Sequence, residues 1–572
     1  MNNTLFPSNP RVYLWATLGL LVFLNFQAWM KDYGPAPQSA ETPPVAGAPV
    51  PPATDLRNQL PAGAQSAGGP STAVPAAPSQ APAAPAAATL AGEGAPAINV
   101  RTDVLDVDIS PRGGTLTRVD LPAYPQVKGE AAPVRLENHD APQTLYELQT
   151  GLTGPGAGPY PDQNAQYTSA SSDYRLGSAA ELRVPLTWSA DGVTVTKTYT
   201  FRRGAYGIEV AYEVHNGGSS DYETRPFAQI VRNDPPTKRS YFNVDSYAYH
   251  GPAIYDGTKY RKLDPTNRED MHLALEVRDG WFAALQHHFV SALVPPQGAP
   301  WVFSLAVAGN QYQLGGVGPA QSLAPGASAQ FAQTLFVGPK LQNQLEAIAP
   351  ELGRVADYGR LWFLARPLFW LLAKVHALTG NWGISIILVT FLLKLLFYPL
   401  SEASGRSMAK MKTLQPRIKN LQETYKDDRE KLGRAMMELY QREKINPVAG
   451  CLPIVIQIPV FIAFYWVLLE SVEMRQAPFM AWIHDLSSRD PLFILPAIMA
   501  VAMFLQYKLN PTPPDPVQAK VFMFMPLVMS VMFAFFPAGL VLYWVTNTVL
   551  SIAQQWNINR RIEAVAAAKR AN

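Results

Sequence analysis

The chain has 572 residues, of which 48% are hydrophobic and 16% are charged, and its formal net charge is +3. This length exceeds that of one compact domain, and a charged fraction well below the usual value of about 25% indicates long apolar segments. The small net charge excludes a general affinity for nucleic acid. The single cysteine, Cys451, excludes an intrachain disulfide and a thiolate zinc site.

The chain begins with an apolar segment followed by a linker. Residues 12–30 are almost entirely apolar, and at about 1.5 Å per residue they can cross a hydrocarbon core of about 30 Å. A cleaved signal peptide is the alternative, but no small-residue cleavage site follows, which favours an uncleaved transmembrane anchor over residues 1–33. Residues 34–96 are dominated by Pro, Ala, Gly and Ser and are expected to form a disordered tether.

Residues 97–350 have the pattern of a β-rich domain. Val193 and Val195 alternate with threonines, and residues 208–214 alternate between apolar and polar side chains, as half-buried strands do. Asp191-Gly192 before the first run is a hairpin turn signal. We therefore predict a large all-β domain outside the membrane.

The remaining chain is rich in candidate membrane spans. The segment 361–378 is apolar but contains Arg366, Pro367 and Lys374, and each charge at the centre of a span costs about 2.5–3.5 kcal/mol. We therefore predict an interfacial amphipathic helix within residues 351–380. Together with the anchor, the other segments predict six transmembrane helices, five of them within residues 381–556: 382–400, 450–472, 491–508, 521–536 and 538–556.

The distribution of charge orients these spans. The loop 401–447 contains 11 Lys or Arg residues against 7 acidic residues. In the loop 473–490, the only Lys or Arg residues are Arg475 and Arg489. The positive-inside rule then places the loop 401–447, the basic tail 557–572 and both termini in the cytoplasm. The β domain is extracytoplasmic, and the bacterial inner membrane is the expected location.

Polar residues inside the predicted spans indicate a possible hydrated groove. Lys394 lies within the span 382–400 with Thr390 one turn earlier, and snorkelling of the lysine to the interface is the alternative. The last span carries a polar face that could instead serve hydrogen bonding between helices. Gln457 lies between two prolines of another span. The polar face of the last span consists of Tyr543, Asn547, Ser551 and Gln554.

The cytoplasmic loop 401–447 is predicted to form an antiparallel helical hairpin. Its apolar residues recur at spacings of three and four, which is typical of helical seams that pack together. Its methionines and basic residues would also suit an adaptable surface for apolar clients or ribosomal RNA. The candidate contact residues are Met408, Met411, Met436, Met437, Lys410 and Lys412.

No enzymatic motif accompanies these features. The sequence contains no HExxH, Walker A or nucleophile-elbow motif, and the adjacent His287 and His288 point in different directions on any regular element. We expect no catalytic residues, cofactor or metal. Two alternatives remain: a polytopic transporter with a periplasmic sensor domain, which would usually show inverted repeats, and a sugar-acting enzyme, which would need paired carboxylates in the β domain.

Several motifs resemble one known family. The membrane half is similar to the YidC/Oxa/Alb membrane protein insertases in their long Gram-negative YidC form, and the β domain resembles the periplasmic domain of that family. The matching runs of the β domain include Arg112-Gly-Gly114 and Leu121-Pro-Ala-Tyr-Pro125. Those of the membrane half include Gly380-Asn-Trp-Gly383, Tyr398-Pro-Leu400, Asn446-Pro447, Gly450-Cys451, Arg475-Gln-Ala-Pro-Phe479, Trp482-Ile-His-Asp-Leu486 and Gly539-Leu-Val-Leu-Tyr543.

The resemblance implies a β-supersandwich outside the membrane and a five-helix insertase core with a hydrophilic groove. A positive residue in the first core span lies in that groove; here it is Lys394, where the family commonly has arginine. Thr390 corresponds to a client-contact position, and Trp544 stands where some members have a second tyrosine after Tyr543. The implied function is ATP-independent insertion and folding of membrane proteins. The implied partners are nascent membrane proteins, the Sec translocon, membrane lipids, and the ribosome through the hairpin and the basic tail.

Overall fold

The computed structural model describes residues 96–571 except 141, 156–157, 234–247, 426–427, 444–451 and 510–515. The predicted anchor, almost all of the linker and the motif residues 446–451 therefore lie outside the described residues. The described chain divides into two compact units. Residues 96–359 and 470–476 form one, the β unit, and residues 360–469 and 477–571 form the other, the helical unit.

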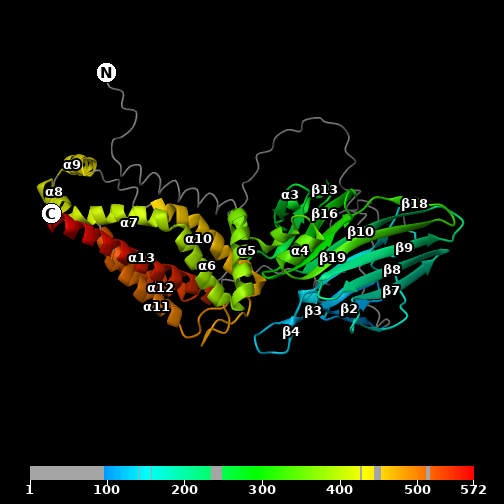
Figure 1. Ribbon diagram of the computed structural model, residues 1–572. Coiled ribbons are helices and arrows are strands. Elements are labelled where there is room, and N and C mark those ends of the chain that lie inside the picture. Colours follow the sequence, from blue (N-terminus) through cyan, green and yellow to red (C-terminus); the bar gives the residue numbers. More distant parts are fainter. Residues whose placement is uncertain are drawn as a thin grey trace, which may run out of the picture. The chain divides into compact units, whose positions relative to one another are not determined.

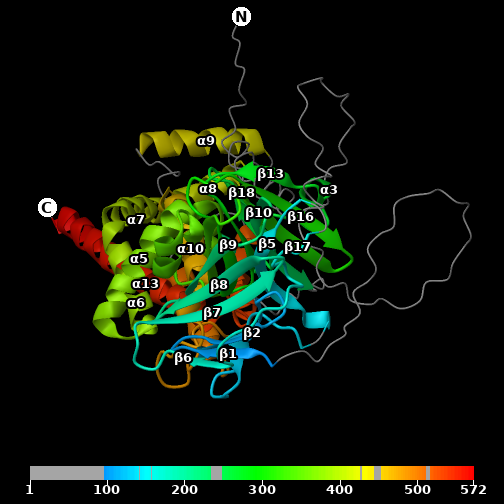
Figure 2. The same ribbon diagram turned by 90° about the vertical axis from the view of Figure 1, so that its right-hand side faces the viewer.

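The β unit consists of two large sheets, as predicted for an all-β domain (Figures 1 and 2). Two short helices, α3 (Arg268–Met271) and α4 (Gln342–Ile348), accompany them. The first sheet contains β13 (Ala274–Val277), β16 (Trp301–Ala308), β17 (Gln311–Val317), β10 (Tyr222–Asn233), β5 (Tyr146–Thr153), β3 (Thr115–Pro125), β2 (Asp106–Ser110), β1 (Ile98–Arg101) and β6 (Asp173–Arg175) in this order, with β18 (Gln321–Leu323) beside β10 and β4 (Pro133–Arg135) beside β3.

The second sheet contains the strands that the alternating pattern predicted. Asp191 and Gly192 both have positive φ angles, 48° and 80°, and form the hairpin turn that precedes β8. Val193 pairs with Asn216 across β8 and β9. The order of the sheet is β12 (Tyr260–Lys262), β11 (Gly251–Tyr255), β14 (Trp281–Leu285), β15 (Phe289–Val294), β19 (Ser328–Pro339), β9 (Gly207–Asn216), β8 (Val193–Arg202) and β7 (Glu181–Ala190).

The core of the β unit contains residues of both sheets and the fully buried Lys197. Lys197 has the strand parity of Val195 and Tyr199 and is fully buried with them. Its ammonium donates hydrogen bonds to the carbonyl oxygens of Gly113, Gly114 and Thr150 at 3.0, 2.9 and 2.8 Å. Both glycines have positive φ angles, which a residue without Cβ adopts at no steric cost. The Arg112-Gly-Gly114 motif therefore forms a turn that a buried lysine fixes.

The helical unit contains the apolar helices and the hairpin (Figure 1). The first core helix ends at Leu396, four residues before the predicted limit, and continues after a bend of 59° into the next helix. Pro399 explains the break because it lacks an N–H group and its ring clashes with the preceding turn. The helices are α5 (Trp362–Thr379), α6 (Trp382–Leu396), α7 (Tyr398–Thr413), α8 (Gln415–Thr424), α9 (Arg429–Arg442), α10 (Leu452–Glu470), α11 (Ile494–Leu509), α12 (Pro516–Phe533) and α13 (Ala538–Ala571).

The number of spans is not confirmed by helix length. Among the described residues, the one straight helix long and apolar enough to cross a membrane is residues 359–379, which includes α5, the segment predicted to be interfacial. The bent pair of α6 and residues 398–406 also passes the same test. Residues 456–470, 494–509 and 520–533 form shorter apolar helices. The last helix, α13, runs on to Ala571, so the predicted boundary between span and basic tail at residue 556 lies inside one continuous helix.

Candidate functional site

The start of α6 is fixed by the Gly380-Asn-Trp-Gly383 motif. Gly380 ends α5 with a φ of 64°. The side chain of Asn381 accepts a hydrogen bond from the N–H of Ile384 at 3.1 Å and donates one to the carbonyl of Phe479 at 2.8 Å. A Cβ atom on Gly383 would lie only 2.1 Å from the Phe479 ring. These contacts set where α6 begins and therefore where its polar residues lie.

Lys394 of α6 is hydrogen-bonded to α13. Its ammonium donates to the hydroxyl of Ser551 at 2.8 Å, and that hydroxyl donates to the backbone carbonyl of Asn547 at 2.7 Å. Ser551 belongs to the polar face predicted for the last span. The contact directs the lysine toward a neighbouring helix of the same unit and is a hydrogen bond between helices, the alternative raised above for this polar face.

Thr390 lies one helical turn before Lys394 but has a local partner. Its side chain is 1% exposed and its hydroxyl donates to the carbonyl of Ile386 at 2.6 Å. Threonines in helices often bond in this way to the preceding turn. In this structure Thr390 is therefore buried and its hydroxyl proton is used within α6.

Tyr543 and Trp544 lie among the aromatic residues of α10 and α12. The centre of the Tyr543 ring is 5.8 Å from that of Phe461 and 4.9 Å from that of Phe464. The Trp544 ring is 4.8 Å from Phe461 and 5.4 Å from Phe533. Its indole Nε1 is buried and has no hydrogen-bond partner among the described residues. Buried indole N–H groups usually find a hydrogen-bond partner, so this donor is an exception.

The side chains of Gln457 and Asn547 are not part of the hydrogen bond between Lys394 and Ser551. Both side chains are half-buried, and Asn547 contributes its backbone carbonyl rather than its amide to the Lys394–Ser551 chain. The sequence patterns did not single out Phe461, which contacts both Tyr543 and Trp544. It lies one turn after Gln457, so the same helical stripe would have identified it.

The predicted hairpin is present as α8 and α9, and its apolar seams pack together. Leu414, Ile418 and Leu439 are buried in one cluster, and Met436 packs against it. An ion pair of 2.7 Å between Arg417 and Glu443 also joins the two arms. This contact pattern is the packing alternative raised above. Met411 and Met437 are half-buried, whereas the side chains of Met408, Lys410 and Lys412 lie outside the described residues.

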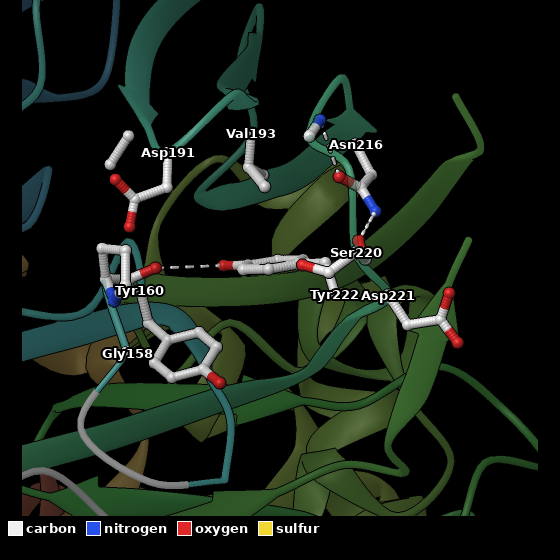
Figure 3. Close-up of a pocket in the computed structure, with 11 residues that line it drawn as sticks. Gly158, Tyr160, Asp191, Val193, Asn216, Ser220, Asp221 and Tyr222 are labelled. Carbon is white, nitrogen blue, oxygen red and sulfur yellow. Dashed lines mark hydrogen bonds between the residues drawn. The ribbon is translucent and has the colours of Figure 1, made fainter. Parts of the chain in front are cut away.

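A pocket of about 170 Å³ in the β unit does not provide a clear reactive site (Figure 3). The amide of Asn216 donates to the carbonyls of Ser220 and Leu323 and is therefore occupied. Asp191 and Asp221 are exposed. No group of three or more potential metal ligands occurs in the described part of the chain. The pocket is lined by Gly158, Pro159, Tyr160, Ala190, Asp191, Val193, Asn216, Gly218, Ser220, Asp221 and Tyr222.

Comparison with known proteins identifies both units. Residues 374–565 match the family described as 60Kd inner membrane protein, and residues 97–371 match the YidC periplasmic domain. The membrane protein insertase YidC of Thioalkalivibrio sulfidiphilus is 46% identical over 97% of this chain and 99% of its own length. That of Stutzerimonas stutzeri is 44% identical over the same shares. An active YidC insertase crystal structure aligns with 80% of this chain and 93% of its own, at 17% identity and a TM-score of 0.35.

These matches, which cover almost the entire chain, define an inner-membrane protein that inserts other proteins into the membrane and carries a periplasmic domain. The chain belongs to the YidC family of membrane protein insertases. Residues 97–359 of the β unit belong to its periplasmic domain, whereas residues 470–476 lie within the match to the 60Kd inner membrane protein family. The resemblance inferred from the sequence motifs is therefore confirmed.

Proposed function

We propose that client segments enter the membrane through a hydrophilic groove lined by Lys394, Gln457, Trp544, Asn547 and Ser551. Tyr543 and Thr390 form its packed wall. The observation that carries the proposal is the hydrogen bond between Lys394 and Ser551, which joins α6 to α13. The groove lets the polar flank of a client enter the membrane without losing all of its hydration.

The charge of Lys394 supports this role. A lysine at the centre of a span costs about 2.5–3.5 kcal/mol unless polar partners or water solvate it. An ammonium has three hydrogen-bond donors, and the hydroxyl of Ser551 occupies one. The other donors can bind water or a carboxylate on a client. Because lysine is a point charge without the fork geometry of arginine, it attracts acidic segments without bidentate recognition.

The apolar part of a client would then pass into lipid along α10 and α12. Transfer of apolar surface out of water supplies about 25 cal/mol per Å², so the step needs no nucleotide hydrolysis. Both helices present large apolar side chains that are exposed in the described chain. They are Ile456 and Ile458 on α10, and Val521, Phe522, Met523, Phe524, Met525, Leu527, Val528, Val531 and Met532 on α12.

The charge distribution supports a six-span topology with α5 at the interface. Arg366 and Lys374 are exposed on α5, as expected for an interfacial helix. The hairpin and the basic end of α13 then face the cytoplasm, where they can contact the ribosome. We further propose that the insertase binds the Sec translocon and membrane lipids.

Substitution of Lys394 tests the groove. Lys394→Glu should impair insertion of clients with acidic translocated tails because it replaces attraction by repulsion, whereas Lys394→Arg should retain it. Lys508→Glu is a matched control, since Lys508 is an exposed lysine near the end of α11. Insertion is measured by protease protection of a client tail in proteoliposomes. Equal insertion with Glu and Arg at position 394 would refute the electrostatic role.

Photocrosslinking provides an independent readout. A photoreactive residue at position 394 should form adducts with nascent membrane proteins during their synthesis, and one at position 508 should form few. Adducts that are equal at both positions, or absent at 394, would contradict a client path along α6.

A further inference from the structure

A segment of seven residues that begins with the last residue of α10 packs as part of the β unit. We call the segment Glu470–Gln476 the docking segment. Connecting segments usually stay at the surface, where water satisfies their backbone groups. Here Glu470, Ser471, Val472 and Met474 are only 2, 2, 1 and 1% exposed. Such burial indicates a specific binding site for the segment.

Arg475 of the docking segment contacts the residues at the end of β3 and the start of β15. Its guanidinium donates hydrogen bonds to the carbonyl oxygens of Pro125 at 2.8 Å and Gln126 at 3.1 Å. Its Cζ atom also lies 5.5 Å from the centre of the Phe289 ring, within the range of a cation–π interaction. Planar donors and a weakly hydrated charge suit arginine to this combination of carbonyls and ring.

Gln476, the next residue, forms hydrogen bonds through both its side chain and its backbone. The side-chain amide of Gln476 donates to the carbonyl of Pro125 at 3.0 Å, and the ammonium of Lys128 donates to the backbone carbonyl of Gln476 at 2.7 Å. Pro125 is the last residue of β3, and the hydrogen bonds connect positions about 350 residues apart in the sequence. Two of the family-like motifs, Leu121–Pro125 and Arg475–Phe479, therefore meet here.

The first residues of the docking segment are also held. The hydroxyls of Ser471 and Tyr358 are 3.2 Å apart, and Tyr358 accepts a hydrogen bond from the amide of Gln342 on α4. Lys340 is 3% exposed, and burial lowers its pKa while the charge of Glu470 counteracts this effect. Contacts at both ends make the segment an integral part of the β unit.

We propose that the end of β3 and the start of β15 form a docking site whose ligand is the chain's own segment Glu470–Gln476, and that the periplasmic domain thereby positions the end of α10 during insertion. Glu470 is also the last residue of α10, so a site that holds the segment restrains that end of the helix. The positioning role rests on the proposed client path along α10. Arg475 acts in it as a positioning residue.

Crosslinking measures docking separately from insertion. Lys128→Cys and Gln476→Cys, made in a Cys451→Ser background, place thiols at a pair of residues in contact. In the membrane-embedded full chain, a bismaleimide should link them rapidly. Arg475→Ala should reduce the docked-to-undocked ratio, and with it the initial crosslinking rate, about tenfold, because hydrogen bonds from a charged group are lost. Arg475→Lys should have an intermediate effect.

Insertion is then measured in the same variants before and after crosslinking. If docking positions α10, Arg475→Ala lowers client insertion and the bismaleimide link restores it, which a merely misfolded variant would not allow. Arg183→Ala is the matched control, since this exposed arginine pairs with Glu181 on β7, and it should change neither readout. An unchanged crosslinking rate in Arg475→Ala, or an insertion defect that the link does not restore, would overturn the proposal.

The Lys394 variants separate the two proposals. Lys394→Glu should lower insertion while the rate of crosslinking between positions 128 and 476 stays unchanged. Failure of the groove proposal would appear as normal insertion by Lys394→Glu. Failure of the docking proposal would appear as an unchanged crosslinking rate in Arg475→Ala, or as an insertion defect that the bismaleimide link does not restore.

Discussion

Replacement of the buried Lys197 by methionine should destabilise the periplasmic domain without leaving a large cavity. Methionine has a similar unbranched shape but no donors, so the carbonyls of Gly113 and Thr150 lose the ammonium. The carbonyl of Gly114 retains a hydrogen bond from the hydroxyl of Tyr199. A buried carbonyl without its partner costs about 1–3 kcal/mol, so two of them give a loss of about 2–4 kcal/mol after the gain from removing a buried charge.

Urea unfolding of the full chain in detergent, followed by pulse proteolysis of the periplasmic domain, measures this loss. With a slope of about 2 kcal/mol per molar urea, the midpoint should fall by about 1–2 M. Lys259→Met is the control, since Lys259 is exposed and should leave the midpoint unchanged. A midpoint that rises or stays constant in Lys197→Met would mean that the desolvation of the ammonium outweighs its three hydrogen bonds, and would refute the reasoning.

Three further substitutions test other parts of the structure. Burial raises the pKa of Glu137 to about 7, so the folded domain favours the neutral acid, and a penalty of at most roughly 3 kcal/mol develops as the pH rises from about 4.5 to 7. Glu137→Gln keeps an acceptor for Ser291 and should raise the urea midpoint at pH 8 but little at pH 4; equal gains at both would contradict this assignment. Gly383→Ala should force the Phe479 ring aside and lower thermal stability in detergent by about 1–3 kcal/mol, whereas Gly433→Ala, in open space on α9, should not. Asp490→Ala removes the acceptor for Trp482 and for the N–H groups of Leu492 and Leu495, which should cost about 3 kcal/mol in the same assay. Asp428→Ala, at the start of α9, should cost clearly less; equal losses would refute the importance of burial.

Local patterns predicted the strands well because each depends on residues close in sequence. The alternation around Val193 and the turn at Asp191-Gly192 identified the hairpin that β8 completes. The same parity places Lys197 on the inward face. Its three acceptors come from positions 47 to 84 residues away and could not be predicted from local pattern.

Helix limits and helix pairing were harder to predict. Hydropathy did not detect that Pro399 separates α6 from α7, because the prolyl residue interrupts the backbone without interrupting the apolar run. For the candidate groove, helical spacing identified a polar face on the last span but did not assign it to Lys394. The choice of Ser551 depends on the rotation of α13 against α6, which the sequence of either helix alone does not determine.

Three cationic side chains, Lys197, Arg475 and Lys394, have different hydrogen-bond partners, from which we expect different roles. Lys197 donates to three backbone carbonyls and is fully enclosed, so its hydrogen-bonding capacity is used within the fold. Arg475 binds two carbonyls beside an aromatic ring, which suits it to holding a segment in place. Lys394 binds a hydroxyl that can itself reorient, and it lies in an apolar helix where an ammonium needs further polar partners. Because those further partners can be water or a client carboxylate, Lys394 is the cation whose substitution should change insertion directly, whereas Arg475 should act through the position of α10 and Lys197 through the stability of the domain.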